Sequence, residues 1–230
     1  MTTSGTYAFN PSLGELVLYA FNLAGLRNTS LLVEHFQTAR MSANLLLSRW
    51  ANQGVNLWAV DLVTVPLVQG TATYSVAANT VTVLDVYTAL VQDSTETDRI
   101  ILPISRTEYA SYPNKNQQGT ISAFWFDRLL APTITLWCVP DGTSAQYLKY
   151  YRVRQIQDAV MTNGSTVEVP YLWLEAFAYA LAARLAIIWN AQMATALKAA
   201  ADEAYDIAAA QNIEQANMYI APQLSGYYRP

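Results

Sequence analysis

The acidic side chains that could do chemistry are spread along the chain without a catalytic pattern. The candidates are Asp61, Asp85, Asp127, Asp141, Glu168 and Glu175. A glycoside hydrolase needs two carboxylates at a defined separation across the scissile bond, and spacing along the sequence does not reveal one. The chain contains no Gly-x-Ser-x-Gly, P-loop, Gly-x-Gly-x-x-Gly or His-Glu-x-x-His motif. We therefore expect no enzymatic activity, and a hydrolase with paired carboxylates remains an alternative.

Histidine and cysteine each occur once, which limits metal and redox chemistry. A single Cys138 excludes an internal disulfide and a cysteine-based zinc site, and a single His35 argues against a histidine cluster. Cys138 lies in an apolar run and is expected to be a small core residue. His35, near the start of a helix, is expected at the surface or in a hydrogen bond. No metal and no cofactor is predicted.

Two tryptophans offer a second kind of site. Trp125 and Trp137 belong to apolar strands and are expected to pack in the core. Exposed and coplanar, they could instead form a platform for a sugar ring. That alternative is a carbohydrate-binding β-sandwich module with a helical appendage, which a glycan column would retain.

The composition points to a protein with much covered surface. Of its 230 residues, 53% are hydrophobic and 13% are charged, about half the usual charged share. The net charge is −4, so the basic footprint of a nucleic-acid-binding protein is absent. The arginines Arg40, Arg49, Arg152 and Arg154 are too scattered to grip phosphates. Few charges fit a subunit whose flanks are covered by neighbours.

The sequence favours a soluble protein made in the cytoplasm. Its first residues lack the basic and apolar regions of a signal peptide. The most apolar window, from Ala176 to Ala191, is short for a membrane span and has Arg184 at its middle. We therefore predict no membrane association.

Helices are predicted before and after a strand-rich region. Ser12 and Glu15 form a capping box that opens a helix ending at Gly25. A second helix is expected from Leu31 to about Gln53, because apolar residues recur there at helical spacing. The stretch Pro170–Ile213 is rich in helix formers. One straight helix of that length would span roughly 66 Å, so a break is expected near Asn190.

Between the helices, Thr, Val, Tyr and Trp dominate, and turn residues recur about every ten positions. Asp93–Arg99 is expected to be a polar hairpin tip, and Ser105 with Glu108 to cap a short helical turn. Asn163-Gly164 is expected to close a last hairpin before Val167–Val169. Strands are predicted at Leu57–Leu67, Ala72–Val76, Thr80–Val91, Ile100–Leu102, Thr120–Phe126, Thr133–Val139 and Gln146–Val153.

This order predicts an α+β fold. It would contain a bundle of about four helices, two N-terminal and two C-terminal, with an inserted antiparallel β unit that is sandwich- or barrel-like. The expected division is 1–56 and 170–213 for the helical domain, 57–169 for the β domain and 214–230 for an extended tail.

The last residues, Met218 to Pro230, are too aromatic for a typical disordered tail. Two prolines and a glycine prevent a continuous helix there. The segment could be disordered, fold back on its own chain or dock on a partner. We favour docking, because aromatic anchors in a flexible segment can wrap a large surface.

Several segments together resemble the head-to-tail adaptor proteins of short-tailed bacteriophages. The passage ARMSANLLLSRWANQGVNLWAV, residues 39–60, is similar to their helix-to-strand passage, with its Arg, Asn-Leu run, Trp, Gly and Leu-Trp pair. ILPISRTEYASYPNKNQQGTISAFWFDR, ITLWCVPDG and VEVPYLWLEAFAYALAARLA resemble later segments of that family in the same order. A Gly-x-Pro pair that the family often has before the aromatic strand is missing, because Gln118-Gly119-Thr120 stands there.

The resemblance implies a structural virion protein at the head-tail junction. It would form a ring, usually of twelve copies, between the portal and a tail or nozzle protein, and DNA would pass its lumen without specific binding. Because the C-terminal segment of such proteins commonly contacts the portal, we assign portal binding to the large side chains of the tail. These are Tyr219, Ile220, Leu224, Tyr227, Tyr228 and Arg229.

Overall fold

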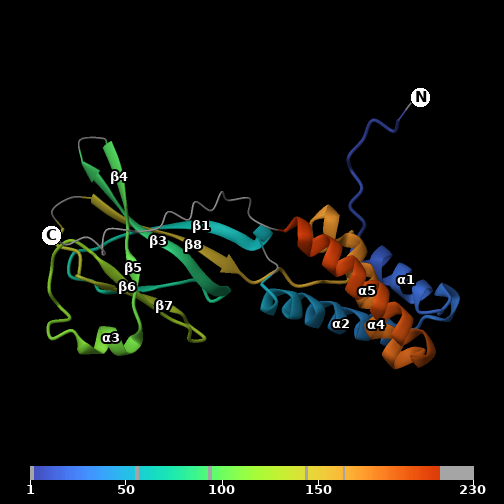
Figure 1. Cartoon of the computed structure of the whole chain (residues 1–230). Coiled ribbons are helices and arrows are strands. Elements are labelled where there is room, and N and C mark those ends of the chain that lie inside the picture. The colour runs from blue at the N-terminus through green and yellow to red at the C-terminus, as the bar shows by residue number, and fades with distance from the viewer. Residues whose placement is uncertain (1–2, 55–56, 93–94, 143–144, 163, 213–230) are drawn as a thin grey trace, which may run out of the picture.

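The computed structural model describes residues 3–54, 57–92, 95–142, 145–162 and 164–212, which form two lobes joined by a neck (Figure 1). The helical lobe contains α1 (Leu13–Leu23), α2 (Val33–Asn52), α4 (Leu174–Trp189) and α5 (Ala191–Gln211). The β lobe contains two four-stranded sheets and the short α3 (Arg106–Ser111). The α+β class predicted from the sequence is confirmed.

The helices begin and end close to where the capping signals predict. At α1, the Ser12 hydroxyl accepts a hydrogen bond from Glu15 N at 3.3 Å, and the Glu15 carboxylate accepts one from Ser12 N at 2.8 Å. This reciprocal pair satisfies two backbone donors that a helix start leaves unpaired. The predicted break near Asn190 is also confirmed, because this residue lies between α4 and α5. Its side chain donates to Ala24 O at 2.9 Å, after the end of α1.

The core of the helical lobe centres on α4. This helix packs against α1, α2 and α5, and Phe177, Leu181 and Leu185 are fully buried along it. Alanine is the commonest residue in this core, and such small side chains allow neighbouring helices to approach closely. The lobe therefore has the predicted four helices, but its packing is organised around one of them rather than around an axis shared equally by all.

The β lobe is a sandwich of two sheets. The first has the order β1-β8-β3-β4 and is antiparallel throughout. The second has the order β2-β7-β6-β5. Large side chains from both sheets meet between them, including Tyr74, Phe124, Ile134, Leu148 and Tyr150. The strands are β1 (Val60–Pro66), β2 (Thr73–Ser75), β3 (Thr80–Gln92), β4 (Thr95–Ile100), β5 (Leu102–Pro103), β6 (Ala123–Asp127), β7 (Thr133–Trp137) and β8 (Ala145–Arg154).

The sequence predicted a sandwich- or barrel-like β unit, and of these two forms the sandwich is present, because each sheet ends in edge strands and does not close into a barrel. The prediction of a wholly antiparallel unit is wrong, because β5 runs parallel to β6. The parallel pair arises because the chain between β5 and β6 crosses over through α3 instead of turning in a hairpin.

Two local predictions are also wrong. Most of the expected polar tip at Asp93–Arg99 is strand β4, which pairs with β3, while residues 93 and 94 lie outside the described part. Every residue of β4 is exposed, so the strand lacks the apolar alternation that would reveal it. The expected hairpin before Val167–Val169 is not formed by residues 155–162 and 164–169. Val167 and Val169 instead pack into the helical core.

Candidate assembly surfaces

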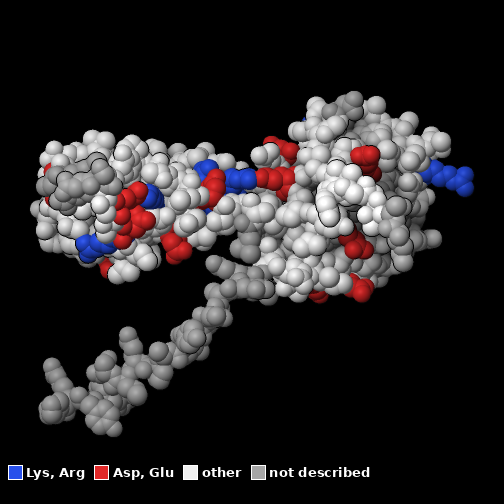
Figure 2. Space-filling view, turned by 90° about the horizontal axis from the view of Figure 1, so that it is seen from above, with Lys and Arg blue, Asp and Glu red and all other residues white. Residues whose placement is uncertain are grey.

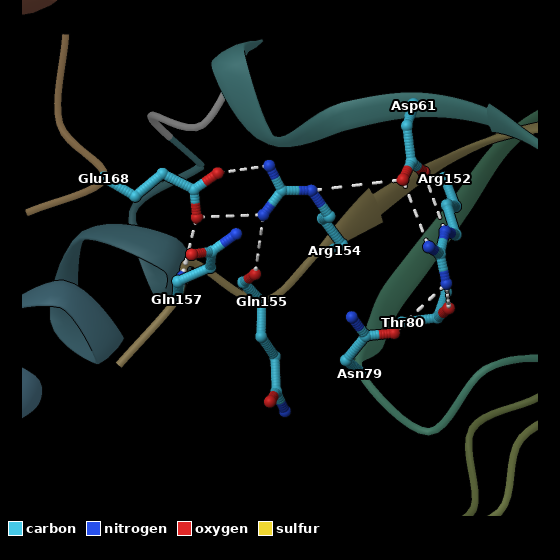
Figure 3. Close-up of polar contacts among 8 residues, drawn as sticks. All are labelled: Asp61, Asn79, Thr80, Arg152, Arg154, Gln155, Gln157 and Glu168. Atoms are coloured by element: carbon cyan, nitrogen blue, oxygen red, sulfur yellow. Dashed lines mark hydrogen bonds and ion pairs between the residues drawn. The ribbon is translucent and has the colours of Figure 1, made fainter. Parts of the chain in front are cut away.

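The neck is the region where β8 continues into residues 155–169, which lead to α4. A network of ion pairs at the end of β8 stabilises it (Figure 3). Arg152 donates from Nε and Nη2 to the two carboxylate oxygens of Asp61 on β1, at 2.7 and 3.1 Å. Its Nη1 donates at 3.1 Å to both Asn79 Oδ1 and Thr80 Oγ1 beside β3. Arg152 thus joins three neighbouring strand segments where the sheet meets the neck.

Arg154 continues this network toward the helical lobe. It makes a two-bonded ion pair with Glu168, with one of the bonds, from Nη1 to Oε2, at 2.9 Å. Glu168 also accepts a hydrogen bond from Gln157 N at 2.7 Å. Such forked pairs between Arg and a carboxylate fix orientation as well as distance. Arg154 Nε lies 3.9 Å from Asp61, so both carboxylates share one guanidinium.

A second brace attaches the neck to α2. The Asn44 side chain donates to Ala159 O at 3.0 Å and accepts from Ala159 N at 2.9 Å. These bonds satisfy the backbone of a segment that has no ladder or helix of its own. Together with the contacts of Glu168, these two hydrogen bonds attach the connection from β8 to α4 to both lobes. The neck is therefore a fixed spacer between the lobes.

The carboxylates considered for catalysis lie on several different elements of the described structure. Arg152 lowers the pKa of Asp61, and Arg154 lowers the pKa of Glu168, which is the opposite of what a general acid needs. Asp61 and Glu168 are brought together only through the guanidinium of Arg154, which both carboxylates contact. Asp85 and Asp127 lie on strands of different sheets, and Glu175 is in the first turn of α4. Among the described residues, no group of His, Cys, Asp and Glu could hold a metal ion.

The two tryptophans of the β lobe are covered by tyrosines from around α3. Trp137 stacks on Tyr112 with ring centroids 4.1 Å apart, and Trp125 stacks on Tyr109 at 5.7 Å. A sugar ring would have to displace these partners, so the stacking gives no support to a carbohydrate platform. Cys138 is buried, as expected.

At the far end of the helical lobe, His35 holds α2 against α4. Its Nδ1 accepts a hydrogen bond from Leu32 N at 3.0 Å, and its ring stacks on Trp189 with centroids 4.2 Å apart. The side chain is buried and hydrogen-bonded, which leaves no ligand role to assign to it. The N-cap position of α2 is Leu32, which is not one of the usual capping residues Ser, Thr, Asp and Asn. The His35 side chain, three residues further on, accepts the hydrogen bond of the Leu32 N–H instead.

Around this contact lies an exposed apolar surface, which we call the distal patch. Its residues are Leu32, Val33, Ile187, Ile188 and Met193. Ile187 is 67% exposed although it closes an otherwise buried helix. Exposed apolar groups gathered in one place mark interaction sites. This patch was not predicted from the sequence, although the Ile-Ile-Trp run before the polar Asn190 was a signal for it.

On the face seen in Figure 2, acidic side chains are scattered over the helical lobe, whereas acidic and basic side chains lie next to one another on the neck and the β lobe. The stretch Tyr171–Trp189 is long and apolar enough to cross a membrane, but 56% of it is buried inside the protein. Burial of this kind is typical of the central helix of a soluble domain. The tail residues assigned to portal binding lie outside the described residues.

The order of the elements and the ion-paired neck agree with an adaptor subunit. A comparison with protein families decides the assignment. The family of SU10 adaptor proteins matches residues 17–225. The chain belongs to this family. The match covers both lobes, so the resemblance to phage adaptors is confirmed over nearly the whole chain. No curated protein is significantly similar to it.

Membership identifies the chain as a structural adaptor protein of a bacteriophage rather than as an enzyme family member. It also implies a place at the head-tail junction of the virion and contacts with portal and tail proteins in general. The segments quoted for the resemblance, which lie between residues 39 and 186, fall on α2, the β lobe and α4.

Proposed function

We propose that this adaptor forms a ring of twelve copies between the portal and the tail or nozzle protein. The observation that carries this proposal is the family match over 17–225, which spans the helical lobe, the braced neck and the β lobe alike. In the proposed ring each subunit uses two different patches for its two neighbours, which is how a closed cyclic assembly is built.

We propose that each domain contacts a different partner. The proposed domains are the helical domain, 1–56 and 170–213, the β domain, 57–169, and the tail, 214–230. We propose that the helical domain and the tail dock on the portal, while the β domain faces the tail side. The exposed distal patch supports a docking role for the helical end. DNA would pass the lumen without specific binding, since the chain is acidic overall.

Within the tail, we propose Tyr219, Ile220, Leu224, Tyr227, Tyr228 and Arg229 as portal contacts that become ordered on docking. Limited proteolysis tests this. Free adaptor should lose its tail at low protease concentrations, and adaptor bound to the portal should keep it. A tail that resists cleavage equally in both states would contradict the proposal.

The ring itself is tested by mass. The purified adaptor is mixed with the portal ring of the same phage and analysed by native mass spectrometry beside the adaptor alone. We expect a species made of the portal and a fixed number of adaptor copies, with twelve as the predicted number. If the adaptor does not bind the portal ring, or if the number of bound copies varies, the proposal is wrong.

A further inference from the structure

A groove between α2, α4 and α5 combines apolar walls with a cluster of positive charge. It has a volume of about 510 Å³. Leu46, Trp50 and Tyr205 contribute to the walls, and Arg49, Arg184 and Lys198 contribute the charge. Asp202 is the acidic residue on its lining. In a chain with a net charge of −4, such a concentration of cations is a local exception.

Within the part of the chain that the structure describes, the side chains of Arg49, Arg184 and Lys198 make no ion pair and no hydrogen bond. Burial lowers the pKa of Arg184, and the neighbouring Arg49 lowers it further. A partly buried cation beside a like charge is unfavourable alone, and an incoming carboxylate would relieve both the burial and the repulsion.

A complementary surface lies on another side of α5. Glu203, Asp206 and Ile207 are exposed there, together with Ala196, Ala199 and Ala210. At 100° per residue these positions share one face of the helix, and its centre lies roughly 160° around the helix from Lys198, Ala201 and Tyr205, which line the groove. Ile207 is 65% exposed, and the alanines around it let another helix come close. We call this the outer face of α5.

We propose that, in the assembled adaptor, the outer face of α5 of one copy docks in the groove of the next copy. Glu203 and Asp206 would meet Arg184, Arg49 and Lys198, and Ile207 would meet the apolar wall. This inference rests on the proposed ring. Two different patches on one chain, opposite in charge and both open, are what a head-to-tail cyclic contact requires.

Other occupants fit the groove less well. The segment 213–230 has one acidic residue, Glu214, and one basic residue, Arg229, so it offers no net charge to the cations. A DNA backbone stays hydrated and is bound on exposed basic surfaces, whereas Trp50 is buried and Arg184 is half-buried on the groove lining. A helix that presents both carboxylates and an apolar side chain matches both halves of the lining.

Charge exchange tests the contact during assembly on the portal. Arg184→Glu and Glu203→Arg should each raise the adaptor concentration needed to fill the ring, by about tenfold or more. The double variant should recover most of the loss. Arg106→Glu on α3 is the matched control and should assemble like the wild type, and circular dichroism checks that each variant is folded. Single variants that fill the ring at the wild-type concentration would overturn the inference.

A cross-linking experiment without the portal keeps the test independent of the proposed function. Cys138 is first replaced by Ser. Lys198→Cys and Asp206→Cys are then placed in separate proteins, which are mixed at high concentration under oxidising conditions. A disulfide should join the two variants, and Lys198→Cys mixed with Arg106→Cys should give none. If the wild type fails to join the portal ring, the proposed function falls, while the presence or absence of this disulfide still decides the interface.

Discussion

The two lobes reach their packing by opposite routes. The helical core is rich in alanine and is organised around one nearly enclosed helix, α4. In the β lobe, the buried cluster between the two sheets is filled by the larger side chains of Tyr, Phe, Ile, Leu and Val. Close-packed small residues have no room for added atoms, whereas a core of large side chains loses most when atoms are removed.

The neck differs from both lobes because polar contacts hold it. Asp61, Arg152, Arg154 and Glu168 form its ion pairs, and Asn44 braces its backbone. Separating the two cores in this way lets each lobe present its own surface, while the network fixes their relative direction. The expected effects of substitutions follow from these differences.

The largest effect is expected at the contact of α4 with the aromatic residues of α2. Phe177 is fully buried, and its ring lies 6.0 Å from that of Trp50, edge to face. Phe177→Ala should lower the free energy of unfolding by about 3–5 kcal/mol. Thermal and urea unfolding would measure the loss, with the exposed Leu172→Ala as control. Equal effects of the two substitutions would show that α4 is not the centre of the core.

A cavity in the β core should be nearly as damaging. Leu136 on β7 is fully buried between the sheets, and Leu136→Ala should cost about 2–5 kcal/mol. Leu130→Ala, at a side chain that is 99% exposed, is the control. Following tyrosine and tryptophan fluorescence along with circular dichroism would reveal whether the β lobe unfolds before the helices. Unchanged unfolding of Leu136→Ala would contradict the assigned core.

A larger side chain in the helical core tests the contrast between the two cores most directly. Ala182 is fully buried in α4, and Ala182→Leu should destabilise the protein by about 1–3 kcal/mol because the surrounding helices must move apart. Ala199→Leu adds the same atoms on the exposed side of α5 and should change little. A stabilised Ala182→Leu variant would indicate free space in the helical core and would weaken the contrast drawn here.

The neck should give a smaller and pH-dependent effect. Because the pKa of Glu168 is lowered in the folded protein, its carboxylate stabilises the fold above the unfolded value of about 4.3 and loses this contribution as the pH falls through the folded value. Glu168→Gln should cost about 1 kcal/mol at neutral pH. It should also flatten the fall in stability below about pH 4. The exposed Glu203→Gln should reproduce the wild-type curve of unfolding free energy against pH, and an unflattened Glu168→Gln curve would remove Glu168 from the network.

An effect of about the same size is expected at the cap of α1, and the smallest effect at the cap of α3. Ser12→Ala should cost about 0.5–2 kcal/mol, because α1 inserts buried residues into the helical core. Ser105 also accepts a hydrogen bond from the N–H three residues on, at 3.1 Å from Glu108 N, but α3 has no buried residue. Ser105→Ala should therefore change global unfolding less. The reverse order, measured by urea unfolding, would mean that α3 matters more to the fold than its exposure suggests.

Local signals in the sequence predicted the helices, their caps, the break at Asn190 and most strands, because capping residues and apolar spacing act between near neighbours. The family resemblance depended on the same near-neighbour passages, such as residues 39–60. Strand β4 escaped prediction because an edge strand exposed on both faces carries no apolar alternation. The parallel β5–β6 pair escaped because pairing direction depends on the path of the connection.

The sequence by itself determined the α+β class, the absence of a recognisable catalytic motif and the adaptor resemblance. Only the tertiary structure decided which charges pair, since Asp61 and Arg152 are far apart in the chain and meet across two strands. The same holds for the groove, whose cations come from three helices, and for the outer face of α5. Contacts between distant residues depend on how the elements pack, and that information is not carried by any short stretch of chain.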